Sequence, residues 1–296
     1  MINSNWQTVT DHISLLGEGP LWDEQKQRII WLDILNGKVH SFVPETSAYS
    51  FFKTGQLTGA AVLTSRGTMI GALQNGFYEL NEADGSSRFI ADPEANLPEN
   101  RFNDGKCDPQ GRFWAGTMNI PETSVSGNLY VLDPDGNVHH RIAGIGCSNG
   151  LAWNAAGDTM YYIDSPTREV VAYDFNADTS EITNRRVVFT VPEGNGFPDG
   201  MTIDAEDKLW VALWDGWKVI RVDPDKGEII ASIGLPAARI TSVAFGGADF
   251  NDLYITSARV GVPEEQLEKQ PLAGSLFVIR DIGVKGLKSV RYVGNR

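Results

Sequence analysis

Six residues, each polar or glycine, occupy the same position of a short segment that recurs along the chain: Glu18, Gly59, Asn103, Asn149, Asp199 and Thr241. They are separated by 41, 44, 46, 50 and 42 residues, and each begins a segment that is followed by a turn and an apolar stretch. A repeat of this length is typical of β-propellers, whose innermost strands meet around one axis. We therefore expect these six residues to face one another around a central channel.

Two carboxylates and one amide in this ring predict a metal site. Glu18 and Asp199 would lie close together, and burying two such charges without compensation is costly or forces one of them to bind a proton. With the amide oxygen of Asn149 they form an all-oxygen ligand set, which suits Ca²⁺, Mg²⁺ or Mn²⁺ and does not exclude Zn²⁺. The alternatives are that these residues only cap strand starts, or that an ion plugs the channel without taking part in chemistry.

The elements that would hold this ring are short strands rich in β-branched and aromatic residues and bounded by Gly, Asp and Asn. The second strands of the repeats are predicted at residues 29–33, 68–72, 112–116, 159–163, 208–213 and 252–256. The third strands are predicted at residues 38–42, 76–80, 128–132, 170–175, 218–222 and 275–279. The sequence thus predicts an all-β fold, a six-bladed β-propeller with about four antiparallel strands per blade, as a single domain over residues 1–296.

Some features of this propeller stay open. Either residues 7–14 or residues 288–293 would complete the sixth blade as its outer strand. The composition allows a short helix at residues 263–268. The longer loops, residues 117–126 and 257–274, are expected to cover part of the channel mouth.

Bulk composition excludes several classes of partner. The net charge of −13 argues against nucleic acid, which normally needs a basic surface. The sequence contains no run of about 18 apolar residues, so no membrane span is predicted. The N-terminal residues lack the basic and apolar regions of a signal peptide, and two cysteines are too few for a disulfide framework, so we expect a cytoplasmic protein of undetermined oligomeric state.

Other motifs are weaker candidates for chemistry. Residues 146–150 match the G-x-S-x-G pattern of serine hydrolases, but Ser148 precedes an expected strand and hairpin rather than the helix of a nucleophile elbow. The four histidines, at positions 12, 40, 139 and 140, are predicted in edge strands or turns away from the mouth, so a Ser/His mechanism is disfavoured. Residues 133–136 resemble the start of a calcium loop, yet the required glutamate is missing and a hairpin turn is expected.

Two arginines are placed to reach the mouth. Arg101 and Arg239 each stand two residues before a position of the ring. Both would direct a cation toward a substrate there, unless they pair with a neighbouring carboxylate such as Asp104.

At these positions the chain resembles the regucalcin/gluconolactonase family, also called SMP-30/gluconolactonase/LRE-like. The resemblance runs from about residue 15 to residue 294 and rests on residues 17–22 (GEGPLW), 101–106 (RFNDGK), 116–118 (GTM), 148–151 (SNGL), 198–201 (PDGM) and 208–210 (KLW). It implies a six-bladed propeller with one catalytic divalent ion held by Glu18, Asn149 and Asp199. It also implies substrate contacts from Arg101 and Asn103, and Glu122 is the nearest match to a further acidic contact, although Pro121 makes the segment differ.

The activity that this resemblance implies is hydrolysis of a sugar-derived lactone to its open acid, with a small-molecule substrate and Asp199 as general base. The ion would be Ca²⁺ first, or Zn²⁺, Mn²⁺ or Mg²⁺. One alternative keeps the ion and changes the substrate to a phosphotriester or aryl ester. Another makes the chain a non-catalytic calcium-binding propeller. The sequence does not name the lactone, the native metal or the role of Arg239.

Overall fold

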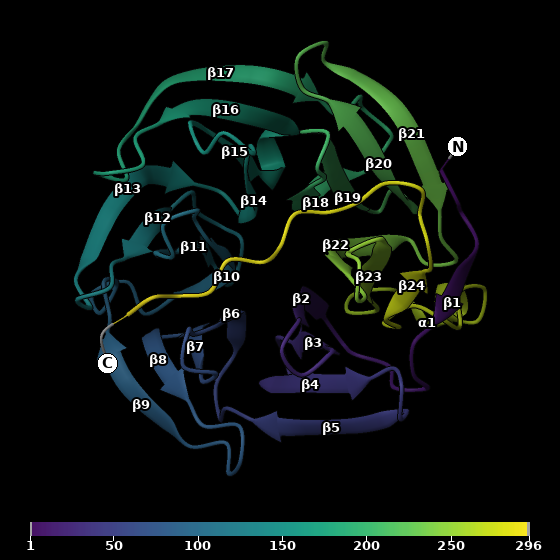
Figure 1. Cartoon of the computed structure of the whole chain (residues 1–296), viewed down its shortest axis with the longest axis horizontal. Helices are drawn as coiled ribbons and strands as arrows, with labels where there is room; N and C mark the ends of the chain where they lie inside the picture. The colour runs from purple at the N-terminus through teal and green to yellow at the C-terminus, as the bar shows by residue number, and fades with distance from the viewer. Residues whose placement is uncertain (1, 295–296) are drawn as a thin grey trace.

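The protein, seen here in a computed structural model that describes residues 2–294, consists of six four-stranded antiparallel sheets arranged in a ring (Figure 1). In five sheets the strands follow the chain order from the channel outward, and the sixth has the order β22-β23-β24-β1. This confirms the predicted all-β, six-bladed propeller. Within the described residues no helix is both long and apolar enough to cross a membrane.

Each blade contributes one strand at each radial position. The inner strands are β2 (Gly17–Asp23), β6 (Thr58–Leu63), β10 (Asn100–Cys107), β14 (Ser148–Trp153), β18 (Phe197–Ile203) and β22 (Arg239–Gly246). The second strands are β3 (Arg28–Asp33), β7 (Met69–Leu73), β11 (Phe113–Asn119), β15 (Thr159–Asp164), β19 (Leu209–Trp214) and β23 (Asp252–Ala258). The third strands are β4 (Lys38–Val43), β8 (Gly76–Leu80), β12 (Gly127–Leu132), β16 (Glu169–Phe175), β20 (Lys218–Asp223) and β24 (Phe277–Ile279). The outer strands are β5 (Ala48–Lys53), β9 (Ser87–Ala91), β13 (Val138–Ile145), β17 (Ile182–Thr190), β21 (Glu228–Gly234) and β1 (Trp6–Thr8).

Burial follows radial position. The second strands β3, β7, β11 and β23 are buried at every residue, which explains their continuous apolar runs, whereas the outer strands are largely exposed. Neighbouring blades pack through aromatic side chains, for example Trp114 against Trp153, with ring centroids 5.7 Å apart. The indole nitrogen of Trp114 donates to Asp108 over 2.9 Å, and Trp210 repeats this bond to Asp204 two blades later. Sheet packing of this kind fixes where the inner strands begin.

The ring is closed by the N-terminal segment. β1 pairs antiparallel with β24, so that Trp6 lies opposite Ile279 and Thr8 opposite Phe277. The sequence left two segments open for the fourth strand of this blade. The strand is β1, Trp6–Thr8, which overlaps residues 7–14 and not residues 288–293.

Residues 285–293 instead cross the end of the channel (Figure 1, yellow). The crossing segment is held by hydrogen bonds to several blades. The N–H of Ala205 donates to the carbonyl of Lys285, and the N–H of Tyr292 donates to the carbonyl of Leu63, each over 2.8 Å. Because Leu63 and Ala205 lie at the far ends of inner strands, this segment covers the end of the channel opposite to the ring of polar residues.

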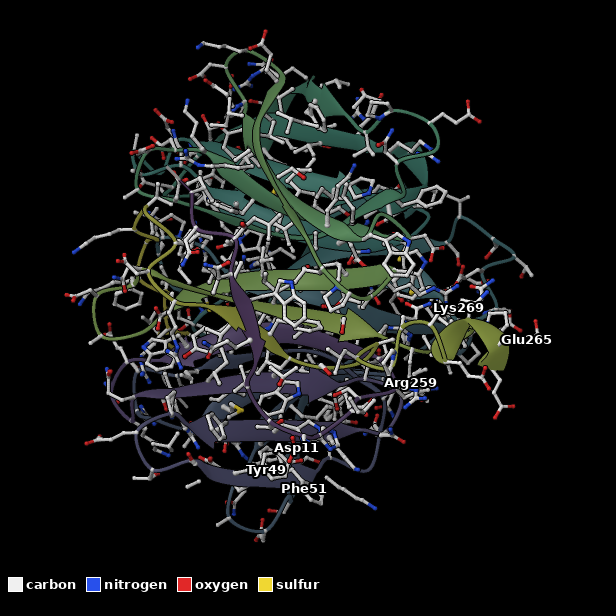
Figure 2. All side chains as sticks on the ribbon, turned by 90° about the vertical axis from the view of Figure 1, so that its right-hand side faces the viewer. Asp11, Tyr49, Phe51, Arg259, Glu265 and Lys269 are labelled. Atoms are coloured by element: carbon white, nitrogen blue, oxygen red, sulfur yellow. The ribbon has the colours of Figure 1, made fainter. Side chains whose placement is uncertain are left out.

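The short helix expected in the last blade is present as α1 (Glu264–Leu267), and a single 3₁₀ turn, η1, covers Ser165–Thr167. Figure 2 shows α1 projecting beyond the strands at one end of the molecule, with Arg259, Glu265 and Lys269 around it. This is the end at which the second strands finish and the inner strands begin. The loop from β23 to β24 therefore stands at the rim of the mouth, as expected.

Candidate active site

A register irregularity occurs in every inner strand at the residue of the ring. The pairing with the second strand shifts between Glu18 and Leu21, Thr58 and Ala60, Phe102 and Asp104, Asn149 and Leu151, Pro198 and Met201, and Ile240 and Ser242. An irregularity of this kind leaves one residue out of the ladder and redirects its side chain. Asn103 and Asp199 are thereby left out of strand pairing, whereas Glu18 and Asn149 are the last paired residues before the irregularities of their strands.

Hydrogen bonds between neighbouring blades join residues at this level of the channel. The Nδ2 of Asn103 donates to the Oδ1 of Asn149 over 3.1 Å. The hydroxyl of Thr241 donates to the carbonyl of Gly17 over 2.6 Å, which ties the sixth blade to the first. Gly59 takes part through its backbone, because a Cβ there would lie 2.3 Å from the carbonyl oxygen of Phe102. Only glycine allows β6 and β10 to approach this closely.

Three buried carboxylates surround the channel axis. Burial, with the charge of Asp104 second, raises the pKa of Glu18 to about 8. Burial, with the charges of Glu18 and Asp104 after it, raises the pKa of Asp199 well above its ordinary value. The pKa of Asp104 is also raised by burial, against the opposing charge of Lys106. Each shift has burial as its first cause, so the ionised form of each carboxyl would carry a negative charge that the protein alone compensates poorly.

This uncompensated charge is the observation that fits a cation. Glu18 and Asp199 each accept a hydrogen bond from the N–H of the glycine that follows, over 2.9 Å in the case of Gly19. Carboxylate oxygens with free lone pairs remain, and Asn149 adds an amide oxygen. The set of Glu18, Asn149 and Asp199 therefore suits a divalent ion that prefers oxygen ligands. That these three residues, expected from the sequence, hold an ion stays a prediction.

Hydrogen bonds fix the amide of Asn149. Its Nδ2 donates to the Oγ of Ser165 over 2.8 Å, and that hydroxyl donates in turn to the carbonyl of Pro198 over 2.6 Å. While the nitrogen is held by η1, the Oδ1 atom accepts the hydrogen bond from Asn103 and keeps a second lone pair. Ser165 was not predicted from the sequence, because its contact depends on how the 3₁₀ turn folds back over β18.

Arg101 and Asn103 form a connected pair rather than two separate substrate contacts. The Nη1 of Arg101 donates to the Oδ1 of Asn103 over 2.8 Å and to the carbonyl of Phe102 over 2.9 Å. Asn103 also donates to the carbonyl of Ser148 over 2.9 Å. Both ends of the Asn103 amide are thus occupied by the protein. Among residues 2–294 the Nε and Nη2 groups of Arg101 have no hydrogen-bond acceptor, so these donors are free to meet a substrate.

The charge state of Arg101 reflects its position in the mouth. Burial lowers its pKa, while the opposing charges of Glu18, Glu122 and Asp199 act in the other direction. Glu122 lies on the loop after β11, is exposed, and adopts a positive φ of 54°. Because the charge of Glu122 acts on the pKa of Arg101, Glu122 lies on the same side of the channel as Arg101. Arg101 is not ion-paired with Asp104 within the described chain.

The guanidinium of Arg239 contacts residues at the rim of the channel mouth. Its Nε donates to Asp215 over 3.0 Å, its Nη1 donates to the carbonyl of Val260, and its guanidinium lies 4.6 Å from the ring centroid of Trp214. These contacts connect β22 to the loops after β19 and β23. The structure therefore gives Arg239 a role in holding loops.

The rival motifs do not form sites. Ser148 is fully buried at the first residue of β14, where its Oγ accepts a hydrogen bond from the hydroxyl of Tyr162 over 2.9 Å. His139 contacts Asp133 and His140 contacts Asn128, both on the outer edge of the third blade, as predicted.

The expectation for His40 is wrong. His40 lies on the third strand β4, is fully buried, and faces His12 with ring centroids 4.3 Å apart. The N-terminal segment folds back over the first blade and covers it, which no local pattern in the sequence indicates. His12, Asp33 and His40 bring their ligand atoms within 4.8 Å of one another, a cluster that the sequence analysis missed.

A cavity of about 270 Å³ continues the channel behind the ring. Asp104 and Lys106 line it together with apolar residues of the inner strands, and residues 287–290 of the crossing segment form its far wall. The ammonium of Lys106 donates to the carbonyl of Met201 over 2.6 Å. The channel therefore contains a polar ring at the mouth and a mostly apolar space behind it.

Comparison with known proteins places this arrangement in a family. Residues 16–259 match the family model described as the SMP-30/gluconolactonase/LRE-like region. The chain belongs to this family. Regucalcin of Xenopus laevis is 38% identical over 94% of this chain and 95% of its own. A Bacillus subtilis protein named as a candidate sugar lactone lactonase is 38% identical over 96% of this chain and 97% of its own. The solved structure of regucalcin from Agrobacterium tumefaciens, described as a calcium-binding protein, superposes with a TM-score of 0.92, at 28% identity over 97% of both chains.

Proposed function

We propose that this SMP-30/gluconolactonase-like protein hydrolyses a sugar-derived lactone, an aldono-1,4- or 1,5-lactone, to the corresponding aldonic acid. The observation that carries the proposal is the ring of Glu18, Asn149 and Asp199 beside the free donors of Arg101. The name of the Bacillus subtilis relative points to the same substrate class. The oxygen ligands favour Ca²⁺ as the ion, and so does the description of the Agrobacterium tumefaciens relative as a calcium-binding protein.

The residues of the ring have two roles, holding the ion and accepting a proton. Glu18, Asn149 and Asp199 would hold the ion, which when bound supplies Lewis-acid polarisation of the lactone carbonyl and a lowered pKa for water. Once the charge of Glu18 is compensated, the Asp199 carboxylate accepts a proton from the water that attacks the carbonyl carbon. The bond from that carbon to the ring oxygen then breaks, and the released oxygen takes the proton held by Asp199, which gives the open hydroxy acid and restores the carboxylate.

Arg101 orients the substrate. Its Nε and Nη2 groups are directed to donate to ring hydroxyls, while Nη1 stays bound to Asn103. Asn103 acts indirectly, because its side chain is hydrogen-bonded to Arg101 and to Asn149 and so holds both in position. Glu122, exposed at the mouth, is a candidate acceptor for a substrate hydroxyl.

The test is acid release from a panel of sugar lactones, followed in a pH-stat with full-length protein. We expect turnover of at least one aldonolactone, loss of turnover on chelation, and recovery when Ca²⁺ is restored. Activity that survives complete chelation would contradict the metal-dependent mechanism. A preference for aryl esters or phosphotriesters over every lactone would replace the substrate class, and inertness toward all of them with Ca²⁺-dependent thermal stability would indicate a binding protein.

A further inference from the structure

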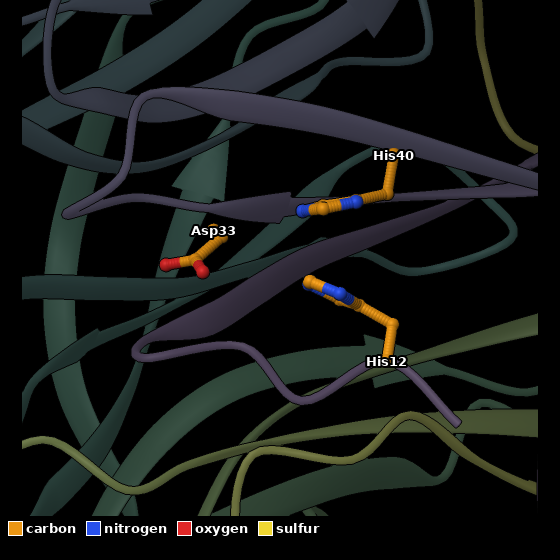
Figure 3. Close-up of side chains that lie close together, drawn as sticks. All are labelled: His12, Asp33 and His40. Carbon is orange, nitrogen blue, oxygen red and sulfur yellow. The ribbon is translucent and has the colours of Figure 1, made fainter. Parts of the chain in front are cut away.

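The second concentration of ligand atoms lies in the first blade, radially outside the polar ring. His40 on β4 and Asp33 at the end of β3 are fully buried, and His12 lies on the segment that precedes β2. Figure 3 shows the two imidazole rings facing each other with the Asp33 carboxylate beside them. Each of the three residues offers an atom to a site in which all ligand atoms lie within 4.8 Å of one another.

Two nitrogen atoms in this cluster are buried without a hydrogen-bond partner among residues 2–294. The Nδ1 of His40 contacts the hydroxyl of Tyr49 over 2.9 Å, but its Nε2 has no hydrogen bond. The Nε2 of His12 is in the same condition. A buried polar atom left unsatisfied costs about 1–3 kcal/mol, so two of them in contact with a carboxylate need an explanation.

Simple packing of aromatic rings does not supply that explanation. The His40 ring is stacked between His12 and Trp31, whose centroid lies 5.0 Å away. An apolar ring would fill the same space without an orphaned nitrogen. The pKa of His40 is lowered to about 3 by burial and then by the neighbouring His12, and burial also lowers the pKa of His12. A metal binds the lone pair of a neutral imidazole nitrogen, and the unpartnered Nε2 atoms of the two rings are the nitrogens that could supply one.

Asp33 has a structural role that leaves room for a ligand. Its carboxylate accepts N–H groups from Leu15, Leu16 and Asn36, which uses three of about four lone-pair sites. In the fourth blade Asp164 makes the equivalent bonds to the N–H groups of Gly146 and Cys147. The described interactions of Asp164 include no histidine, so the turn itself does not require the two imidazoles found beside Asp33.

We propose that His12, Asp33 and His40 form a second metal site, separate from the polar ring, for a divalent ion of the zinc class. Two imidazole nitrogens and one carboxylate are a ligand set for Zn²⁺ or Co²⁺ and not for Ca²⁺. Tetrahedral Zn²⁺ with bonds of about 2.0–2.1 Å needs donors roughly 3.3 Å apart, so the donors must close up by about 1 Å or somewhat more. His12 lies outside the strands, on a segment anchored through the N–H groups of Val9 and Ser14, so the adjustment falls on the residues between these anchors. The Tyr49 hydroxyl would then fix the His40 tautomer from outside the ligand set.

The experiment separates the two sites by their preference for metals. Full-length protein is saturated with Ca²⁺, titrated with Zn²⁺, and dialysed, and bound zinc is counted by mass spectrometry. Co²⁺ added in place of Zn²⁺ reports tetrahedral nitrogen coordination through its visible absorption. We expect one equivalent of Zn²⁺ to remain in excess Ca²⁺, and the same equivalent to remain in a Glu18→Gln, Asp199→Asn double variant.

Variants of the cluster complete the test. His12→Gln should weaken Zn²⁺ binding by at least about tenfold and abolish the Co²⁺ absorption, and His40→Gln should do the same. His140→Gln, on the exposed edge of β13, is the matched control and should bind like the parent. Should His40→Gln fail to fold, His12→Gln still decides, because His12 lies outside the strands. Unchanged Zn²⁺ binding in His12→Gln, loss of the zinc in the double variant, or no retained zinc in the parent would each overturn the proposal.

Discussion

Replacing Glu18 by glutamine should stabilise the metal-free protein at alkaline pH. The folded protein raises the pKa of Glu18 from 4.5 to about 8, chiefly because the carboxyl is buried and secondly because of the charge of Asp104. A group whose pKa is raised by folding favours the folded state only while it is protonated. The metal-free protein therefore loses stability as pH rises from about 4.5, and the loss is complete above about pH 8.

The size of this effect follows from the shift. Each pKa unit corresponds to about 1.4 kcal/mol, so ionising Glu18 in the folded chain costs on the order of 5 kcal/mol. Glutamine keeps the shape and the acceptor for Gly19 but carries no charge. At pH 8.5 in chelator, the Glu18→Gln protein should have a free energy of unfolding higher than that of the parent by several kcal/mol, with the difference vanishing below about pH 4.5.

The assay is urea denaturation at pH 4.5 and pH 8.5, in chelator and in excess Ca²⁺. Glu45→Gln, exposed in the turn between β4 and β5, is the control and should match the parent throughout. Calcium should reverse the order at pH 8.5, because the parent gains binding energy that the variant has lost. A Glu18→Gln protein that is no more stable than the parent at pH 8.5 in chelator would refute the claim that the ring carries an uncompensated charge.

Three further results are expected. Asp199→Asn should fold but lose lactone hydrolysis by at least about 100-fold in kcat, measured by pH-stat, because it removes both a ligand and the proton acceptor; near-parental turnover would exclude that role. Arg101→Lys should lower kcat/KM by roughly tenfold or more, since lysine cannot keep Asn103 in place and present two further donors; an unchanged kcat/KM would remove Arg101 from the substrate site. Ser148→Ala should leave kcat/KM within about threefold of the parent while lowering the free energy of unfolding by about 1–3 kcal/mol, because the buried hydroxyl of Tyr162 loses its acceptor; loss of activity in the folded variant would revive the serine nucleophile.

The repeat spacing was enough to predict the blades and the members of the polar ring. Glu18, Asn103, Asn149 and Asp199 share a register, and in a symmetric fold a shared register means a shared level of the channel. Strand ends differed from prediction by a few residues, as with β11, which extends to Asn119 because Met118 and Asn119 pair with β10. That extension depends on the loop and not on local propensity.

Features that depend on long-range folding could not be read from the sequence. The register irregularity that follows Glu18 has no marker in the sequence apart from the next glycine. His40 sits in an ordinary strand pattern, and its burial comes from His12, 28 positions earlier, folding over it. The choice between residues 7–14 and 288–293 for the last strand was equally open, because both are short and mixed in polarity.

The segment over residues 285–293 lies across the end of the channel behind the polar ring, so we expect substrate to reach Arg101 through the mouth. A lactone and the acid made from it must use the same passage, so the acid has to diffuse out before another lactone can occupy Arg101. Inhibition by the acid should therefore be competitive with the lactone, and we expect no lactone to enter from the covered end of the channel. The carboxylates of Glu18, Asp104 and Asp199 are buried, and in such low-dielectric surroundings their charges act more strongly on a bound molecule than they would in bulk solvent.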